Sequence, residues 1–361
     1  MVTTAKLLDD LKARKPAALA RAISLVENGS QGFEAMLVEL HGSIGGARRI
    51  GITGPPGSGK STLIEKLAAL YRRASHTVGV VAVDPSSPFT GGALLGDRIR
   101  MERASTDPGV FIRSMASRGS LGGMATTTGE VADVMDAYGF DRILIETVGV
   151  GQSELDVASI ADTTVVVLVP ESGDGIQVMK AGLMEIADIF VVNKADRPGA
   201  DRLRQELEVA AGLRRGQTFR HVPAHHGVDL EAVRRSRGAS VRPSVRASGG
   251  DAAGEGVWEP PVVATIAPRG EGVDELGTAL DRHFALLERT GDLAARRTRR
   301  LELRTREVLD RALHRWVWSE AGPRAALEAA LAEVAAGKRS PYEAAAGIVE
   351  RIRRSEPHER V

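Results

Sequence analysis

Gly54-Pro55-Pro56-Gly57-Ser58-Gly59-Lys60-Ser61 is the stretch that decides the fold of this 361-residue chain. It is a complete G-x-x-x-x-G-K-[ST] sequence, the Walker A motif. A β-branched run at residues 49–53 precedes it, and a helical pattern begins at Lys60. Glycines let such a loop curl so that successive N–H groups point inward, and the next helix adds the positive end of its dipole. The stretch therefore predicts a phosphate-binding loop between a strand and a helix.

Two side chains of this loop are expected to do the chemistry. Lys60 would bridge the β- and γ-phosphates of a nucleoside triphosphate, and the Ser61 hydroxyl would ligate Mg²⁺. The expected phosphate-binding set also includes the rest of the loop and the residue that follows it: Gly54, Pro55, Pro56, Gly57, Ser58, Gly59 and Thr62.

A second motif predicts which base is bound. Asn193-Lys194-Ala195-Asp196 follows the apolar run at 189–192. The Asp196 carboxylate can accept hydrogen bonds from the ring N–H and the exocyclic amine of guanine, neither of which adenine offers there. Such a site can reject the wrong base by on the order of 10⁴-fold. We expect Lys194 to lie along the base and Asn193 to tie this loop to the Walker A loop, so the bound nucleotide is GTP or GDP.

A third motif predicts the γ-phosphate side. The apolar run at 142–145 ends in Glu146, which Thr147-Val148-Gly149 follows. This is similar to the D-x-x-G sequence of GTPases, with Glu in place of Asp. We expect Glu146 to bind Mg²⁺, directly or through water, and the Gly149 N–H to contact the γ-phosphate. The residue after Gly149 is not the glutamine of Ras-like enzymes, and Gln152 is the candidate substitute. Slow intrinsic GTP hydrolysis, accelerated by a partner, is therefore expected.

Short apolar runs alternate with helical patterns, which predicts an α/β P-loop fold with a mostly parallel, seven-stranded, doubly wound sheet. The predicted strands are 49–53, 78–83, 110–113, 142–146, 163–169, 189–193 and 262–266. Residues 1–46 and 286–361 are expected to be N-terminal and C-terminal helical extensions of a GTPase domain at 47–285. Within it, 232–257 is rich in Gly, Ser and Arg and is expected to be a mobile insertion.

Composition narrows the functional class. Hydrophobic residues make up 43% and charged residues 26%, as in ordinary globular proteins, and a net charge of +1 offers no strong field for nucleic acid or a membrane. There is no cysteine, which excludes disulfides and thiolate metal sites and fits a reducing cytoplasm. The N-terminus has no signal-peptide pattern, and no apolar run reaches the roughly 18–20 residues of a membrane span. A cytoplasmic location is therefore expected.

The middle of the chain carries a family resemblance. Its segments are ValAlaValAspProSerSerPro at 81–88 with GlyAspArg at 96–98, PheIleArgSerMetAlaSerArgGly at 111–119, and GluThrValGlyValGlyGlnSerGlu at 146–154. These resemble the methylmalonyl-CoA mutase-associated GTPases, the MeaB/ArgK family of cobalamin-related metallochaperones, and the resemblance covers most of the chain. It implies a homodimer built partly by C-terminal helices. It also implies GTP-gated delivery of adenosylcobalamin to an acyl-CoA mutase, and protection of that mutase.

The resemblance also implies further site residues. Asp97 corresponds to a switch-region carboxylate near Mg²⁺, and Asp84 is a second candidate ligand, although an Asp-Pro strand end is the plainer explanation of that acid. Residues 170–182 match a mobile segment that couples the nucleotide state to the mutase. Family members usually carry Thr-Ser-Ala after the last strand, and this segment meets the guanine O6. This chain has Thr265-Ile266-Ala267 there, and a backbone N–H can still contact the O6 atom. The insertion at 214–257 is longer than the family leads us to expect.

Other interpretations stay open at this stage. A P-loop kinase linked to amino-acid transport would place label from GTP on a product other than phosphate, and a GTP-dependent metal insertase would need Cys- or His-rich motifs. His221, His225 and His226 lack acidic or cysteine partners at ligand spacing. The arginines from 296 to 306 are expected to form a solvated helix face. Leu313, Trp316 and Trp318 are expected to be packing or dimer anchors.

Overall fold

The computed structural model describes residues 4–85, 106–117, 123–147, 153–170, 183–213, 258–320 and 324–355. At its centre is a seven-stranded sheet of order β3-β2-β4-β1-β5-β6-β7, in which every strand pair is parallel. The predicted sheet is therefore confirmed. The strands are β1 (Arg48–Thr53), β2 (Val78–Pro85), β3 (Val110–Ser117), β4 (Arg142–Glu146), β5 (Thr163–Leu168), β6 (Ile189–Asn193) and β7 (Val262–Thr265).

Strands β2 and β3 run further than their apolar patterns predict. They pair without interruption from Val78 opposite Val110 to Pro85 opposite Ser117. Apolar periodicity marks only the part of a strand that is buried, whereas the main-chain ladder can continue beyond it. The additional residues extend both strands toward the carboxyl edge of the sheet, where the Walker A loop lies.

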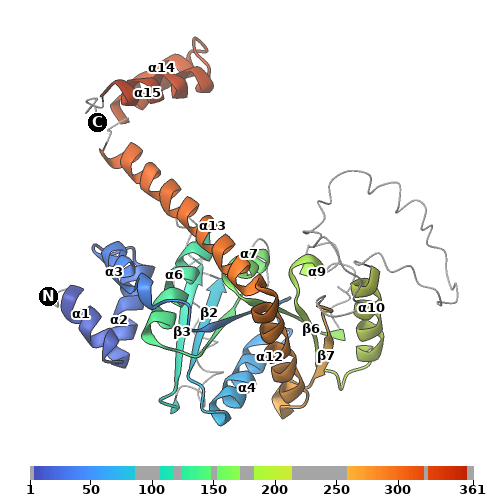
Figure 1. Ribbon diagram of the computed structural model, residues 1–361. Helices are drawn as coiled ribbons and strands as arrows, with labels where there is room; N and C mark the ends of the chain where they lie inside the picture. The colour runs from blue at the N-terminus through green and yellow to red at the C-terminus, as the bar shows by residue number, and fades with distance from the viewer. Residues whose placement is uncertain are drawn as a thin grey trace, which may run out of the picture.

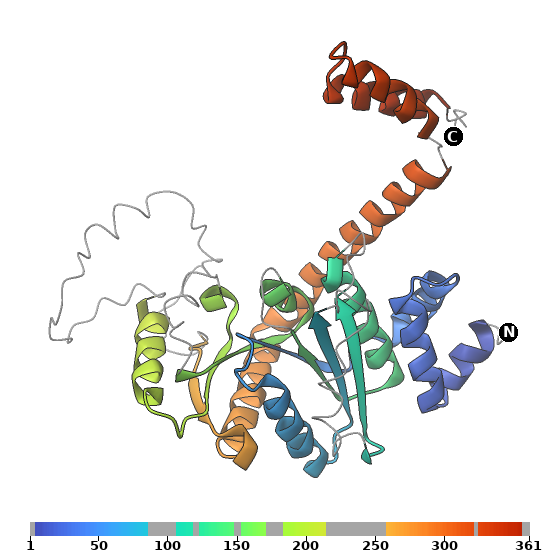
Figure 2. The same cartoon turned by 180° about the vertical axis from the view of Figure 1, so that it is seen from behind.

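Helices cover both faces of the sheet (Figures 1 and 2). One face packs against α4 (Lys60–Arg73) and α12 (Val273–Thr290), and the other against α6 (Gly123–Tyr138), α7 (Ser153–Ile160), α9 (Leu183–Ile186) and α10 (Ala200–Leu213). Alternation along β4 shows the two faces directly: Leu144 lies in the α4 core, whereas Ile143 and Ile145 lie in the α6 core. Strands buried on both faces in this way are apolar throughout.

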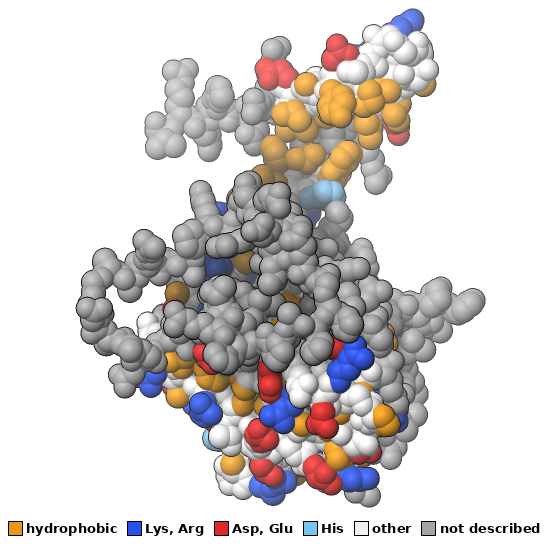
Figure 3. Space-filling model, turned by 90° about the vertical axis from the view of Figure 1, so that its right-hand side faces the viewer, with side chains coloured by type: hydrophobic (Ala, Val, Ile, Leu, Met, Phe, Trp, Pro, Cys, Tyr) orange, Lys and Arg blue, Asp and Glu red, His pale blue; other side chains and the backbone are white. Residues whose placement is uncertain are grey.

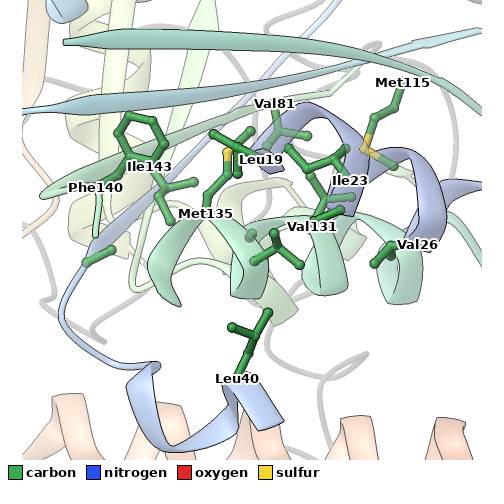
Figure 4. Close-up of a cluster of buried hydrophobic side chains, with 14 of the residues drawn as sticks. Leu19, Ile23, Val26, Leu40, Val81, Met115, Val131, Met135, Phe140 and Ile143 are labelled. Atoms are coloured by element: carbon green, nitrogen blue, oxygen red, sulfur yellow. The ribbon is translucent and has the colours of Figure 1, made fainter. Parts of the chain in front are cut away.

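The N-terminal helices share a core with the sheet. They are α1 (Thr4–Lys12), α2 (Pro16–Glu27) and α3 (Phe33–Leu40), followed by the short η1 (His41–Ser43). Leu19 and Ile23 of α2 are fully buried and join Val131 and Met135 of α6 and Val81 of β2 in one cluster (Figure 4). The N-terminal helices are thus packed directly on the domain through α6. The division of the chain into three parts stays a prediction.

The C-terminal helices lead away from the sheet. After the short η4 (Ala267–Arg269) and α12 come α13 (Asp292–Arg315), a π-helical turn η5 (Trp316–Glu320), α14 (Arg324–Ala335) and α15 (Pro341–Ser355). The first half of α13 crosses the domain, whereas α14 and α15 pack on one another beyond it (Figure 1). No helix within the described ranges combines the length and the apolar character that a bilayer span requires.

The expectation of a solvated arginine face on α13 is wrong. Arg296 makes two hydrogen bonds of 2.9 Å to Asp188, and Arg297 and Arg300 both bind Asp162, which is fully buried. Further along, Arg304 approaches Asp133. Arg299 and Arg306 fit the expectation, because both are exposed and Arg306 pairs with Glu302 on the same helix at the surface. The carboxylates come from loops and helices more than a hundred residues away in sequence, so a helical pattern alone does not reveal them.

Candidate functional site: two loops at the carboxyl edge of the sheet

The Walker A loop joins the end of β1 to the first turn of α4. Gly54, Gly57 and Gly59 have φ values of 136°, 76° and 89°, in the left-handed region that favours glycine. A Cβ on Gly54 would collide with the carbonyl oxygen of Val167, and one on Gly59 with the side-chain amide of Asn193. Two of these glycines are therefore required both by backbone conformation and by the close approach of neighbouring strands.

Lys60 is held inside this loop. Its side chain is buried, and Nζ donates hydrogen bonds to the carbonyl oxygens of Gly54 at 2.8 Å and Pro55 at 3.1 Å. The ammonium group therefore lies within the curl of the loop, where backbone N–H groups and the start of α4 favour an anion. The expected contact of Lys60 with the β- and γ-phosphates stays a prediction.

Ser61 and Glu146 come together from different elements. Glu146 has the same alternation along β4 as Leu144, so its side chain points to the α4 face, and its Oε1 accepts a hydrogen bond of 2.8 Å from Ser61 Oγ. Beside it, Thr147 Oγ1 donates to Thr53 Oγ1 at 2.9 Å, which fixes the end of β4 to the end of β1. A hydroxyl and a carboxylate oxygen together suit Mg²⁺, which prefers oxygen ligands and keeps several waters.

Asn193 connects the base side of the site to the phosphate side. It is buried at the end of β6, and its Nδ2 donates to the Ser58 carbonyl oxygen at 2.8 Å. Its Oδ1 accepts hydrogen bonds from Thr265 Oγ1 at 3.0 Å and from the Ala267 N–H at 3.1 Å. One side chain thus joins the Walker A loop, β6 and the segment after β7. Of residues 265–267, the Ala267 N–H contacts Asn193, and the predicted contacts with guanine O6 stay predictions.

The two residues predicted to face the base lie just beyond Asn193. Lys194 has a φ of 56°, which is uncommon for a residue with a Cβ and is typical of strained functional loops. Asp196 is partly exposed, and Arg269 Nη2 lies 4.0 Å from its Oδ2. The Ala195 N–H donates to the Thr265 carbonyl oxygen at 3.0 Å. This hydrogen bond fixes the main chain directly before Asp196.

Several predicted site residues fall outside what the structure describes. Asp97, Gly149 and Gln152 lie in segments outside the described ranges, as do most of 170–182, the whole of 214–257 and the three histidines at 221, 225 and 226. Asp84 belongs to β2, but its side chain is not described. The roles expected of these residues stay predictions.

Sequence reasoning did not identify Thr147 and Arg269 as parts of this region. Thr147 was only the residue after the acid, yet its hydroxyl fixes the two central strands at their ends. Arg269 follows residues 265–267, and a cation so near the base-reading segment is the signal that could have identified it. Both were inconspicuous because their partners come from distant parts of the chain.

Fold and motifs together define a class: a P-loop protein with a Walker A loop and an Asn-Lys-Ala-Asp base loop, that is, a GTPase. Comparison with known proteins gives the family. The family model described as methylmalonyl-CoA mutase-associated GTPase MeaB matches residues 19–321, and the chain therefore belongs to the MeaB family.

Individual relatives agree with this assignment. A putative GTPase of Pyrococcus horikoshii is 46% identical over 304 residues, which cover 84% of this chain and 85% of that protein. A mouse protein named methylmalonic aciduria type A homolog, mitochondrial, is 37% identical over 249 residues, covering 69% of this chain and 52% of that protein.

Among solved structures, a crystal structure of an LAO/AO transport system kinase resembles this chain in fold. The TM-score is 0.64 at 24% identity, and the match covers 98% of this chain and 99% of that one. At this level of identity, the likeness supports the P-loop architecture alone.

Proposed function

We propose that this GTPase is a chaperone which gates the loading of adenosylcobalamin onto a cobalamin-dependent acyl-CoA mutase of the methylmalonyl-CoA mutase type, and protects that mutase. The observation that carries the proposal is the match to the mutase-associated GTPase family over 19–321, a range that contains the whole nucleotide site. The mouse relative, named for methylmalonic aciduria, supports the same client class. A cytoplasmic location stays an expectation from the sequence.

The chemistry proposed is hydrolysis of GTP to GDP and phosphate. Lys60 and the backbone of residues 54–61 would hold the phosphates, and Asp196 would select guanine. Ser61 and Glu146 would hold Mg²⁺, with Asp84 and Asp97 as further candidate ligands. When bound, Mg²⁺ neutralises charge on the phosphate oxygens. The Gly149 N–H would contact the γ-phosphate, and Gln152 is the candidate for orienting the attacking water.

A slow intrinsic rate follows from the sequence after Gly149. Val150 stands there, and an apolar side chain cannot orient water. In GTPases that lack a complete site, a partner supplies the missing group and can accelerate hydrolysis by 10³-fold or more. We therefore expect the client mutase to stimulate hydrolysis, which would time the handover of cobalamin.

We also propose that the protein forms a homodimer. Large apolar side chains remain exposed on the far half of α13, on η5 and on the two last helices, among them Leu309, Leu313, Trp318, Leu331 and Val349. Figure 3 shows hydrophobic side chains gathered on this C-terminal arm. Apolar surface of this kind marks a protein interface, and the family resemblance points to a second copy of the chain.

The test is to purify the protein with each candidate acyl-CoA mutase and to measure GTP hydrolysis with and without it. We expect one mutase to bind and to raise the rate at least tenfold, and the transfer of adenosylcobalamin, followed by absorbance, to depend on GTP. Ser61→Ala, which loses a proposed Mg²⁺ ligand, should abolish the acceleration. If no mutase binds or stimulates, the chaperone assignment is wrong while the nucleotide site stands.

A further inference from the structure

The topology places the first turns of two helices at the same edge of the sheet as the Walker A loop. In a parallel sheet with helical crossovers, each helix runs antiparallel to the strands and begins at their carboxyl edge. Helix α6 lies in the crossover from β3 to β4, and α7 in the crossover from β4 to β5. The first turn of α6 is therefore at the edge that holds Glu146, and α7 is the next helix along the chain after Glu146.

The side chain of Glu307 on α13 contacts the first turn of α6. The buried Thr126 of α6 donates from Oγ1 to Glu307 Oε2 at 2.7 Å. Asp156 belongs to α7, and burial, followed by the charge of the nearby Glu307 carboxylate, raises the pKa of Asp156. Glu307 is therefore attached to the first turn of α6, whereas its negative charge repels that of Asp156 on α7.

Arg304 makes further contacts with α6, which together with the contact of Glu307 form a junction between α13 and α6. Its Nη1 donates to the Thr126 carbonyl oxygen at 3.1 Å, and its Nη2 lies 3.5 Å from Glu130 Oε1 and 3.4 Å from Asp133 Oδ2. The guanidinium crosses α6 at Gly129, where an added Cβ would lie 2.6 Å from Nη1. The glycine thus provides the space for this close approach.

The earlier part of α13 is fixed elsewhere, so α13 can serve as a rigid reference. Arg297 donates to the Ala47 carbonyl oxygen at 2.9 Å and, with Arg300, to the buried Asp162. Asp162 itself accepts a hydrogen bond from the Arg49 N–H at the start of β1. The helix is therefore attached at the amino edge of the sheet. Arg304 and Glu307, further along the same helix, contact α6 toward the carboxyl edge.

We propose that Glu307 and Arg304 are positioning residues for GTP hydrolysis. They hold the first turn of α6 in place, and through it the carboxyl edge of the sheet on the γ-phosphate side of the site. The proposal rests on GTP hydrolysis at this site and does not depend on which mutase is the client. Groups that are held in place before binding lose less entropy when the transition state forms.

Comparison of two nucleotides separates positioning from a general structural role. GTP and GDP share the base loop and the Walker A contacts, whereas only GTP offers a γ-phosphate. Loss of the junction should therefore weaken GTP binding more than GDP binding and should lower kcat. A merely structural role would affect both nucleotides and the melting temperature together.

The experiment uses the full-length protein and four variants. Glu307→Ala and Arg304→Ala remove the junction. Glu302→Ala and Arg306→Ala are matched controls, because these residues pair with one another on the exposed side of the same helix. Without any mutase, we expect three- to tenfold lower kcat and a similar fall in the GTP-to-GDP affinity ratio for the first pair, with GDP affinity within twofold of the parent. The controls should match the parent.

Conservative variants test whether the hydrogen bond between Thr126 and Glu307 restores the rate of GTP hydrolysis. Glu307→Gln keeps an oxygen that can accept from Thr126 and should recover most of the rate, as should Thr126→Ser, whereas Thr126→Val should behave like Glu307→Ala. The proposal is overturned if Glu307→Ala is indistinguishable from Glu302→Ala, or if GDP binding and the melting temperature fall together with kcat. Since no mutase is present, failure of the chaperone assignment would leave this result unchanged.

Discussion

Asn193 fixes the distance between the Walker A loop and the segment after β7, the two ends of the proposed nucleotide site. Its amide contacts the phosphate loop through the Ser58 carbonyl and the segment after β7 through Thr265 and Ala267. The proposed GTP would span the same two ends, so a fixed spacing would lower the cost of binding it. At this scale the molecule relies on buried hydrogen bonds, each of which is costly to leave unmade.

Replacing this side chain should therefore affect stability as well as binding. Asn193→Ala leaves one carbonyl, one hydroxyl and one N–H group without their partner in a buried place. We expect about 2–3 kcal/mol less free energy of unfolding, measured by urea denaturation, together with weaker binding of both GTP and GDP.

The matched control is Asn28→Ala, because the Asn28 side chain donates one hydrogen bond, to the Ser24 carbonyl oxygen, at the surface. It should change stability by less than about 0.5 kcal/mol. Equal stability of Asn193→Ala and the parent would contradict the role given to Asn193.

Helix α13 shows how charges organise the molecule at the level of elements. Its arginines bind carboxylates at the starts of β5 and β6 and along α6, and the fold depends on these contacts to place the helix. Burial alone would raise the pKa of Asp188, but hydrogen bonding with His283 and Arg296 outweighs burial and lowers the pKa to about 2. Asp188 therefore remains charged at neutral pH even though it is largely buried.

This depressed pKa predicts a pH-dependent contribution to stability. The folded pKa of about 2 lies below the unfolded value of about 3.9, so the contribution is complete above about pH 4 and is lost as the pH falls from about 4 to about 2. It amounts to roughly 2–3 kcal/mol. In urea unfolding, Asp188→Asn should be less stable than the parent at pH 7, and the difference should shrink toward zero near pH 2.

Asp281→Asn is the control, since Asp281 pairs with Arg48 at the surface. Its difference from the parent should be small at every pH. A difference for Asp188→Asn that stays constant from pH 7 to pH 2 would show that the carboxylate charge is not the stabilising group.

The sequence predicts the strands of the sheet but not the contacts of α13. All seven strands were predictable, most clearly those buried on both faces, because such strands are apolar throughout, as residues 165–168 are. The contacts of α13 were not, although Arg297, Arg300, Arg304 and Arg311 recur at spacings of three, four and seven and so share one helix face. Periodicity shows that a face is charged, but whether it meets water or Asp162 is decided by tertiary packing.

The same limit applies to the nucleotide site. The Walker A loop and Asn193-Lys194-Ala195-Asp196 were found because each combines a short motif with a strand before it. The contact between Ser61 and Glu146 was expected from motif roles, since both were assigned to one Mg²⁺ ion. The link from Glu307 to Thr126 has no motif, because it joins two helices 181 residues apart.

At the scale of the whole molecule, the nucleotide domain and the C-terminal arm are joined by a single helix. The domain end of α13 contacts the sheet and α6, while its far end leads to α14 and α15 (Figure 2). An exposed apolar arm is costly in water, and pairing with a second copy would bury it.

Charge introduced into the arm should therefore separate the proposed dimer. Leu309→Asp combined with Leu313→Asp places carboxylates on two exposed apolar positions one helical turn apart. We expect the parent to be a dimer in light scattering and the double variant to be a monomer, with intrinsic GTP hydrolysis changed by less than twofold.

Val38→Asp on α3 is the control, because Val38 is an equally apolar and more exposed side chain that belongs to another part of the molecule. It should leave the dimer intact. A monomeric parent, or a double variant that remains dimeric, would show that the arm is not the dimer interface.

Isothermal titration calorimetry of GTP and ATP with Mg²⁺ tests the central claim most directly, namely that Asp196 makes this pocket a guanine site. The parent should bind GTP with on the order of 10⁴-fold higher affinity than ATP. Asp196→Asn should instead prefer xanthosine triphosphate, since an amide can donate to the oxygen that replaces the guanine amine. ATP bound as tightly as GTP by the parent, with Asp196→Asn showing the same profile, would contradict the account.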